Sequence, residues 1–218
     1  MLATPSRQEI DHRTIKLIVG VIALSLATLT RLFAKSPITS ISASYYEGGW
    51  SQSIFIGFLF AIAAFLLAYN GVTRVEMLLS KIASAAALGV TLFPCACDTH
   101  IPPVPFIHYA SAAVLFFILA FFCYGFFKRA MAKGHTEARR RAKIYALCGV
   151  AIVLAIVIMA LDNLANRALS AVIPQLTFYG EATGLIAFGV SWLTASRVLP
   201  GITRSDERFS PLAESNPA

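Results

Sequence analysis

One carboxylate interrupts an apolar run near the end of the chain. Glu181 lies in the run from Leu176 to Ala195, which is long enough to cross a bilayer, between Gly180 and Gly184. A charge there is costly unless it faces the protein interior, and glycines at this spacing let another helix approach closely. A buried carboxyl pairs with a cation, ligates a metal, or stays protonated and hydrogen-bonded. Glu181 therefore marks either a functional polar site or a hydrogen bond between packed helices.

Possible metal ligands gather in the segment that precedes and opens the fourth apolar run. In deprotonated form, these side chains can bind a divalent metal such as zinc: Cys95, Cys97, Asp98, His100 and His108. Glu181 could add a further ligand. The Cys-x-Cys spacing is tighter than that of structural zinc sites, so a Cys95–Cys97 disulfide in an oxidising periplasm is the alternative. His108 could equally be a hydrogen-bonded residue at a helix start.

The segment between the first two apolar runs alternates small hydroxyls with aromatic side chains. It contains Ser42, Ser44 and Glu47, followed by a Gly pair, and is expected to lie back onto the helices. These three residues are candidate ligand contacts, with loop packing as the equal alternative. The neighbouring aromatic residues Tyr45 and Tyr46 are more typical of an interfacial belt.

A third polar segment follows the fifth apolar run. Asp162 and Asn166, and likewise Asn163 and Arg167, would stack as i, i+4 pairs if that helix continues out of the bilayer. Capping of the helix explains these residues adequately. Asp162 and Arg167 are therefore second-line site candidates.

Composition defines the class of protein that must position these groups. The 218 residues are 57% hydrophobic and only 13% charged, which is more apolar surface than one soluble core hides. We predict an all-α, polytopic membrane protein, with a transmembrane domain over residues 15–195 and tails at 1–14 and 196–218. Spans of about 20 residues suit a bilayer, and six are predicted: Ile15–Phe33, Ser53–Tyr69, Met77–Phe93, His108–Phe127, Ile144–Leu161 and Leu176–Ala195.

The positive charges fix an orientation for this six-helix bundle. Of 18 Lys and Arg residues, only Arg31, Lys35 and Arg167 fall in the segments on one side, so the positive-inside rule places both termini in the cytoplasm. The net charge of +7 is thus topogenic and does not indicate nucleic-acid binding. Lys81, inside the third run, is expected to extend to the inner surface. The basic segment 128–143 could continue two helices as a hairpin, and residues 203–218 read as a mobile tail.

Several short motifs resemble a known group of membrane proteins. They are Gly89-Val90-Thr91-Leu92-Phe93-Pro94, His108 before Ala110-Ser111-Ala112-Ala113, and Glu181 with Ala187-Phe188-Gly189. They resemble six-helix bacterial membrane proteins of unknown function, which are similar to the damage-regulated autophagy modulators and the GPI-anchor remodelling proteins. The resemblance spans residues 15–195 and implies a six-helix layout and lipid-linked biology.

Two classes of function fit the outer polar groups. In the first, a cavity bounded by the second, third, fourth and sixth spans binds or handles a membrane lipid. In the second, His108 and Glu181 act on a lipid ester or amide at the periplasmic face, as acid and base or as metal ligands. A transporter would have polar groups deep in several spans. We favour lipid binding at the bacterial inner membrane, in a chain that could form homo-oligomers through helix packing.

Overall fold

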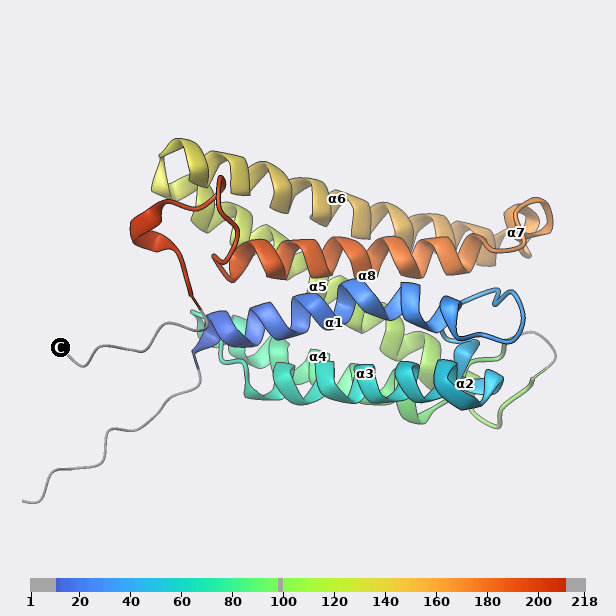
Figure 1. The fold of residues 1–218 in the computed structure, drawn as a ribbon. Helices are drawn as coiled ribbons and strands as arrows, with labels where there is room; N and C mark the ends of the chain where they lie inside the picture. The colour runs from blue at the N-terminus through green and yellow to red at the C-terminus, as the bar shows by residue number, and fades with distance from the viewer. Residues whose placement is uncertain (1–10, 98–99, 211–218) are drawn as a thin grey trace, which may run out of the picture.

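Six long helices form an elongated bundle in the computed structural model, which describes residues 11–97 and 100–210 (Figure 1). Each predicted span lies on one of them, although most helices begin or end a few residues away from the predicted limits. The long helices are α1 (His12–Leu32), α3 (Gly49–Ala68), α4 (Arg74–Leu92), α5 (Pro105–Lys133), α6 (Thr136–Leu164) and α8 (Leu176–Ala195).

Short helices occupy the connections at the two ends of the bundle. The helices α2 (Ser44–Glu47) and α7 (Ala168–Val172) lie at the end opposite to the start of α1 and to the 3-10 turn η1 (Ser205–Glu207) (Figure 1). The sequence analysis anticipated neither α2 nor α7. Within the described ranges the chain contains helices and no strand.

The long helices have the character of membrane spans. Five of them, α1, α3, α4, α5 and α6, are long and apolar enough to cross a bilayer. Large apolar side chains remain exposed on the outer faces, including Leu147, Val150 and Leu154 on α6. The surface of a soluble protein rarely exposes so many large apolar side chains. The chain is therefore a helical membrane protein. The helix α8 has 20 residues and is not among these five.

Neighbouring helices form a closed ring in the order α1, α3, α4, α5, α6, α8, with α5 also touching α8. The tightest backbone approach that we find joins α1 to α8. A Cβ atom on Gly20 would lie 2.9 Å from the Leu193 nitrogen, and one on Gly189 would lie 2.9 Å from the Gly20 oxygen. Gly180 and Gly184, which the sequence analysis singled out, instead make room for side chains of Met159 and Phe116.

The end of the bundle where α1 begins, named the inner end here after the predicted orientation, follows several of the predictions. The helices α5 and α6 form one long hairpin, joined at Gly134, whose φ of 76° is left-handed. The Lys81 ammonium donates to the Tyr69 carbonyl (3.2 Å) and the Asn70 side chain (3.0 Å) at the end of α3. It reaches the inner end, as expected from its long side chain.

The prediction of an unstructured tail from residue 203 is wrong for residues 203–210. The Glu207 carboxylate pairs with Lys133, with Arg141 at 3.0 Å and with Arg197 at 2.5 Å. Burial alone would raise the pKa of Glu207. The opposite effect of these cations is larger, so the pKa of Glu207 falls to about 2. The basic α5–α6 hairpin thus binds a carboxylate from the chain itself, a pairing that local sequence does not reveal.

The Gly20 contact yields a test of the fold. We expect Gly20→Ala to destabilise the protein by about 1–3 kcal/mol, the usual cost of overpacking, because the added methyl group meets α8 backbone. Gly57→Ala on α3 is the matched control, since nothing lies within 4 Å of its added Cβ. Thermal unfolding of the purified variants in one detergent measures the difference. Equal melting temperatures for the two variants would contradict the α1–α8 packing.

Candidate functional site

The segment between α1 and α2 folds back into the end of the bundle that holds α2 and α7, named the outer end here after the predicted orientation (Figure 1). Ile38, Ser40, Ile41 and Ser42 are buried there, and the Phe178 amide at the start of α8 donates to the Thr39 carbonyl at 3.0 Å. A buried loop needs partners for its backbone polar groups. Here α8 supplies several of them.

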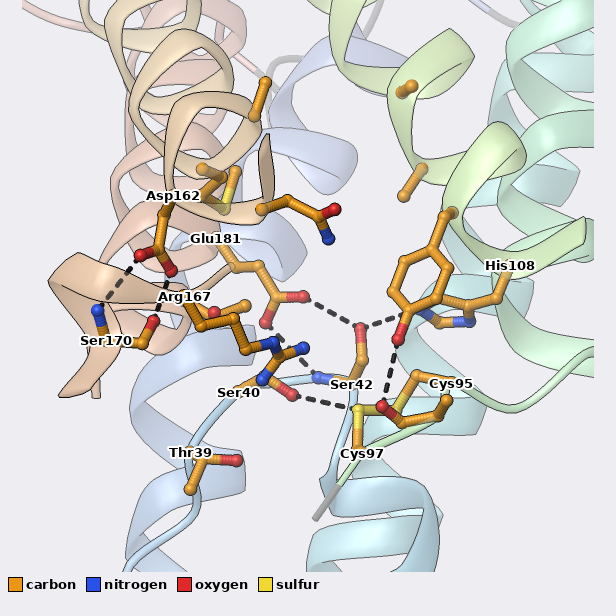
Figure 2. Close-up of a pocket in the computed structure, with 18 of the residues that line it drawn as sticks. Thr39, Ser40, Ser42, Cys95, Cys97, His108, Asp162, Arg167, Ser170 and Glu181 are labelled. Atoms are coloured by element: carbon orange, nitrogen blue, oxygen red, sulfur yellow. Dashed lines mark hydrogen bonds between the residues drawn. A yellow bond between two sulfur atoms is a disulfide. The ribbon is translucent and has the colours of Figure 1, made fainter. Parts of the chain in front are cut away.

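Glu181 of α8 holds this loop through three hydrogen bonds. Its Oε2 atom accepts from the backbone amides of Ile41 (2.5 Å) and Ser42 (3.3 Å), and its Oε1 atom accepts from the Ser42 hydroxyl at 3.0 Å. Figure 2 shows Glu181 with Ser42. The three donors saturate most of the carboxylate's capacity. Glu181 thus faces protein rather than lipid, as the cost of burying a carboxyl in a membrane requires.

His108 approaches the same serine from the start of α5. Its Nδ1 atom lies 2.8 Å from the Phe93 carbonyl and 3.1 Å from the Val90 carbonyl, and its Nε2 atom lies 3.1 Å from the Ser42 hydroxyl. Carbonyl oxygens only accept, so Nδ1 carries a proton. In the neutral ring, Nε2 is then a lone-pair acceptor facing Ser42. His108 is 2% exposed.

Ser42 is therefore the link between His108 and Glu181. Its hydroxyl has one proton and two neighbouring acceptors, so it donates either to Nε2 of His108 or to Oε1 of Glu181. The structure brings His108 and Glu181 together through this serine and not by direct contact. The sequence analysis named all three residues but did not order them in this way.

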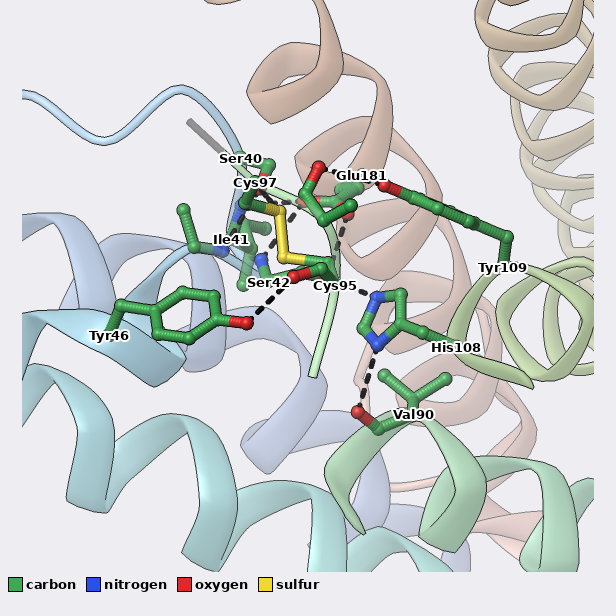
Figure 3. The surroundings of a disulfide bond; sticks show 12 residues. Ser40, Ile41, Ser42, Tyr46, Val90, Cys95, Cys97, His108, Tyr109 and Glu181 are labelled. Carbon is green, nitrogen blue, oxygen red and sulfur yellow. Dashed lines mark hydrogen bonds between the residues drawn. A yellow bond between two sulfur atoms is a disulfide. The ribbon is translucent and has the colours of Figure 1, made fainter. Parts of the chain in front are cut away.

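Beside this group, Cys95 and Cys97 form a disulfide (Figure 3). The Tyr46 hydroxyl donates to the Cys95 carbonyl at 2.8 Å, and the Cys97 sulfur lies 3.5 Å from the Ser40 hydroxyl. A disulfide removes both thiolates from the candidate zinc ligands. Within residues 11–97 and 100–210, no three His, Cys, Asp or Glu side chains lie close enough to share a metal ion.

A cavity of about 1250 Å³ opens onto these residues. Its polar lining includes Ser42, His108 and Glu181, and its apolar lining comes from α5 and α6, with Phe116, Ile156 and Met159 among the lining residues. The cavity therefore lies between α5, α6, α8 and the outer loops. The expectation that the second and third spans would bound it is wrong, because the loop before α2 packs over that side.

Three other candidates lie away from the cavity lining. Glu47 accepts from the Lys35 amide (2.8 Å) and the Ser36 hydroxyl (2.9 Å), and these bonds hold its pKa below the usual value. Ser44 is buried on α2, and the His100 ring stacks on Tyr46 with centroids 3.9 Å apart. These three residues support the loop rather than line the cavity. Asp98 lies outside the described residues.

Asp162 and Arg167 both line the cavity, but not as an extended helix. Asn166 and Arg167 have positive φ angles of 52° and 61°, so α6 ends at Leu164 and the predicted i, i+4 stacking is wrong. Asp162 instead accepts from the amides of Leu169 (2.8 Å) and Ser170 (3.0 Å), which caps α7. Asn tolerates a left-handed backbone, a signal that could have predicted this turn.

No family model, no curated protein and no solved structure matches this chain. The geometry of the outer site therefore carries the functional argument.

The cysteine pattern gives a direct test. We expect the denatured, unreduced protein to present two alkylatable thiols, Cys123 and Cys148, which are free in the structure. Reduction should raise the number to four, because it opens the Cys95–Cys97 bond. Intact-mass measurement after alkylation counts them, with Cys97→Ala as the control that exposes Cys95 without reduction. Four thiols before reduction in protein exported under oxidising conditions would contradict the disulfide.

Proposed function

We propose that this protein binds a membrane lipid in the outer cavity, as a six-span protein of the bacterial inner membrane with both termini in the cytoplasm. The distribution of Lys and Arg supports the orientation. The path of α8 supports the sixth span, since it packs along both α1 and α6 and returns the chain to the end where α1 begins (Figure 1). The resemblance to six-helix bacterial membrane proteins of unknown function implies the same layout.

The cavity carries the proposal. A volume of about 1250 Å³ exceeds that of a typical small-molecule site. Polar groups gather at the outer end, and apolar side chains such as Phe116 and Ile156 line the space between α5 and α6. An amphiphile with its head at the membrane surface and its chains below matches this division.

The charges at the cavity favour an anionic head group. Both lining carboxylates are held by internal donors: Asp162 by α7, and Glu181 by the outer loop. The Arg167 side chain extends toward the cavity (Figure 2). Its guanidinium interacts electrostatically with Asp162 but forms no hydrogen bond or ion pair within residues 11–97 and 100–210. An arginine of this kind matches a phosphate with two parallel hydrogen bonds.

Topology can be tested with reporter fusions. We expect alkaline phosphatase fused after residue 218 to be inactive and the same enzyme inserted after Leu164 to be active, because only periplasmic phosphatase folds with its disulfides. Green fluorescent protein at the same two positions is the reciprocal control. An active C-terminal phosphatase fusion would contradict the orientation, and an inactive fusion after Leu164 would contradict the number of spans.

Lipid binding can be tested by native mass spectrometry of the purified protein with added phosphatidylglycerol or phosphatidylcholine. We expect stronger retention of phosphatidylglycerol and a roughly tenfold loss in Arg167→Gln, the order of one charge-assisted hydrogen bond. Lys35→Gln, which removes an outer charge away from the cavity lining, is the matched control. Ala113→Trp should lower retention of both lipids by filling the cavity.

Three results would contradict this proposal. Unchanged retention in Ala113→Trp would place the lipid outside the cavity. Equal retention of both lipids by the wild type, or an equal loss in Lys35→Gln, would remove the assignment of an anionic head group to Arg167.

A further inference from the structure

The contact between Ser42 and His108 has the geometry of a nucleophile and its general base. The Ser42 hydroxyl lies 3.1 Å from Nε2 of His108, within the distance at which an imidazole takes a serine proton. Both residues line the cavity, so a molecule held there has access to the hydroxyl. Simple packing of the loop does not require an imidazole at this position.

The orientation of the ring is fixed from its other side. Two carbonyls, of Val90 and Phe93, accept from the Nδ1 proton of His108 at 3.1 and 2.8 Å. This selects the tautomer whose Nε2 lone pair points at Ser42. In serine hydrolases a carboxylate performs the same orienting task, and here the end of α4 performs it.

Two amides lie beside the serine and point to one oxygen. The N–H groups of Ile41 and Ser42 both donate to Oε2 of Glu181. Paired backbone donors, one of them the nucleophile's own amide, form the oxyanion hole of chymotrypsin-like proteases. The Glu181 oxygen therefore stands where the oxygen of a tetrahedral intermediate would sit, and a substrate carbonyl must replace it at these amides.

We propose that Ser42 is the nucleophile, and His108 the general base, of an esterase that cleaves an acyl ester of the lipid in the cavity. This inference rests on the proposed lipid-binding function. It differs from an acid–base pair of His108 and Glu181, because Ser42 forms the covalent bond. Glu181 is a positioning residue that holds the loop before substrate enters.

The reaction balances with water as the only co-reactant. The Ser42 oxygen bonds to the ester carbonyl carbon while its proton moves to Nε2 of His108, and the carbonyl electron pair moves onto oxygen. When that pair returns, the bond to the alcohol oxygen breaks, and Nε2 gives its proton to the leaving alcohol. Water activated by the same nitrogen then cleaves the acyl-serine, which releases the fatty acid and restores Ser42.

The test is covalent labelling of the purified full-length protein with a fluorophosphonate probe, which reacts with activated serines. We expect labelling at Ser42, located by peptide mass spectrometry, with none in Ser42→Ala and wild-type labelling in Ser44→Ala, the matched control. His108→Gln should react about 100-fold more slowly, the order of a lost general base. Phosphatidylglycerol should release fatty acid with the wild type and not with Ser42→Ala.

Lipid retention measured on the same samples separates the two proposals. Retention without labelling or fatty-acid release overturns the esterase and leaves lipid binding intact. Labelling without retention overturns the lipid substrate. If Ser42→Ala does not fold, Ser42→Cys replaces it and should react with iodoacetamide faster than Ser44→Cys, since His108 assists thiolate formation. Equal rates would overturn the pairing.

Discussion

The outer half of this protein depends on one carboxylate of α8. Glu181 accepts from the Ile41 and Ser42 amides and from the Ser42 hydroxyl, and without these acceptors the loop would bury unsatisfied donors, each at a cost of roughly 1–3 kcal/mol. The carboxylate in turn tolerates its apolar surroundings because three donors face it. Loop and carboxylate stabilise each other, and together they place the Ser42 hydroxyl at the His108 ring.

Helix packing keeps this polar arrangement in register. The helices α1 and α8 approach backbone to backbone at Gly20 and Gly189, which fixes α8, and therefore Glu181, relative to the loop that follows α1. At the inner end, Glu207 ties the segment after α8 to the α5–α6 hairpin. The cavity lies between α5, α6 and α8, the three helices that this ion cluster connects.

The long helices could be predicted because apolar runs are a local property of the chain, and their shared outer end brought Ser42, His108 and Glu181 into one hypothesis. The partners of each side chain could not be predicted in this way. Glu47 is as polar as Glu181 but finds Lys35 and Ser36 nearby, and neither Gly20 nor Gly189 stands at GxxxG spacing from another glycine. The left-handed turn at Asn166 and Arg167 carries Arg167 to the cavity; Asn166 is a local signal for it, but the sequence does not show that the turn brings Arg167 to the cavity.

The bond between Ile41 and Glu181 joins residues 140 positions apart, and this has a consequence for biogenesis. The loop between α1 and α2 is synthesised early, yet the helix that satisfies its amides follows the other five long helices of the described ranges. Until α8 packs against the bundle, the loop lacks the acceptor for its Ile41 and Ser42 amides. A chain interrupted before α8 would hold five long helices and would leave these two amides of the buried loop unpaired, at a cost of roughly 1–3 kcal/mol each.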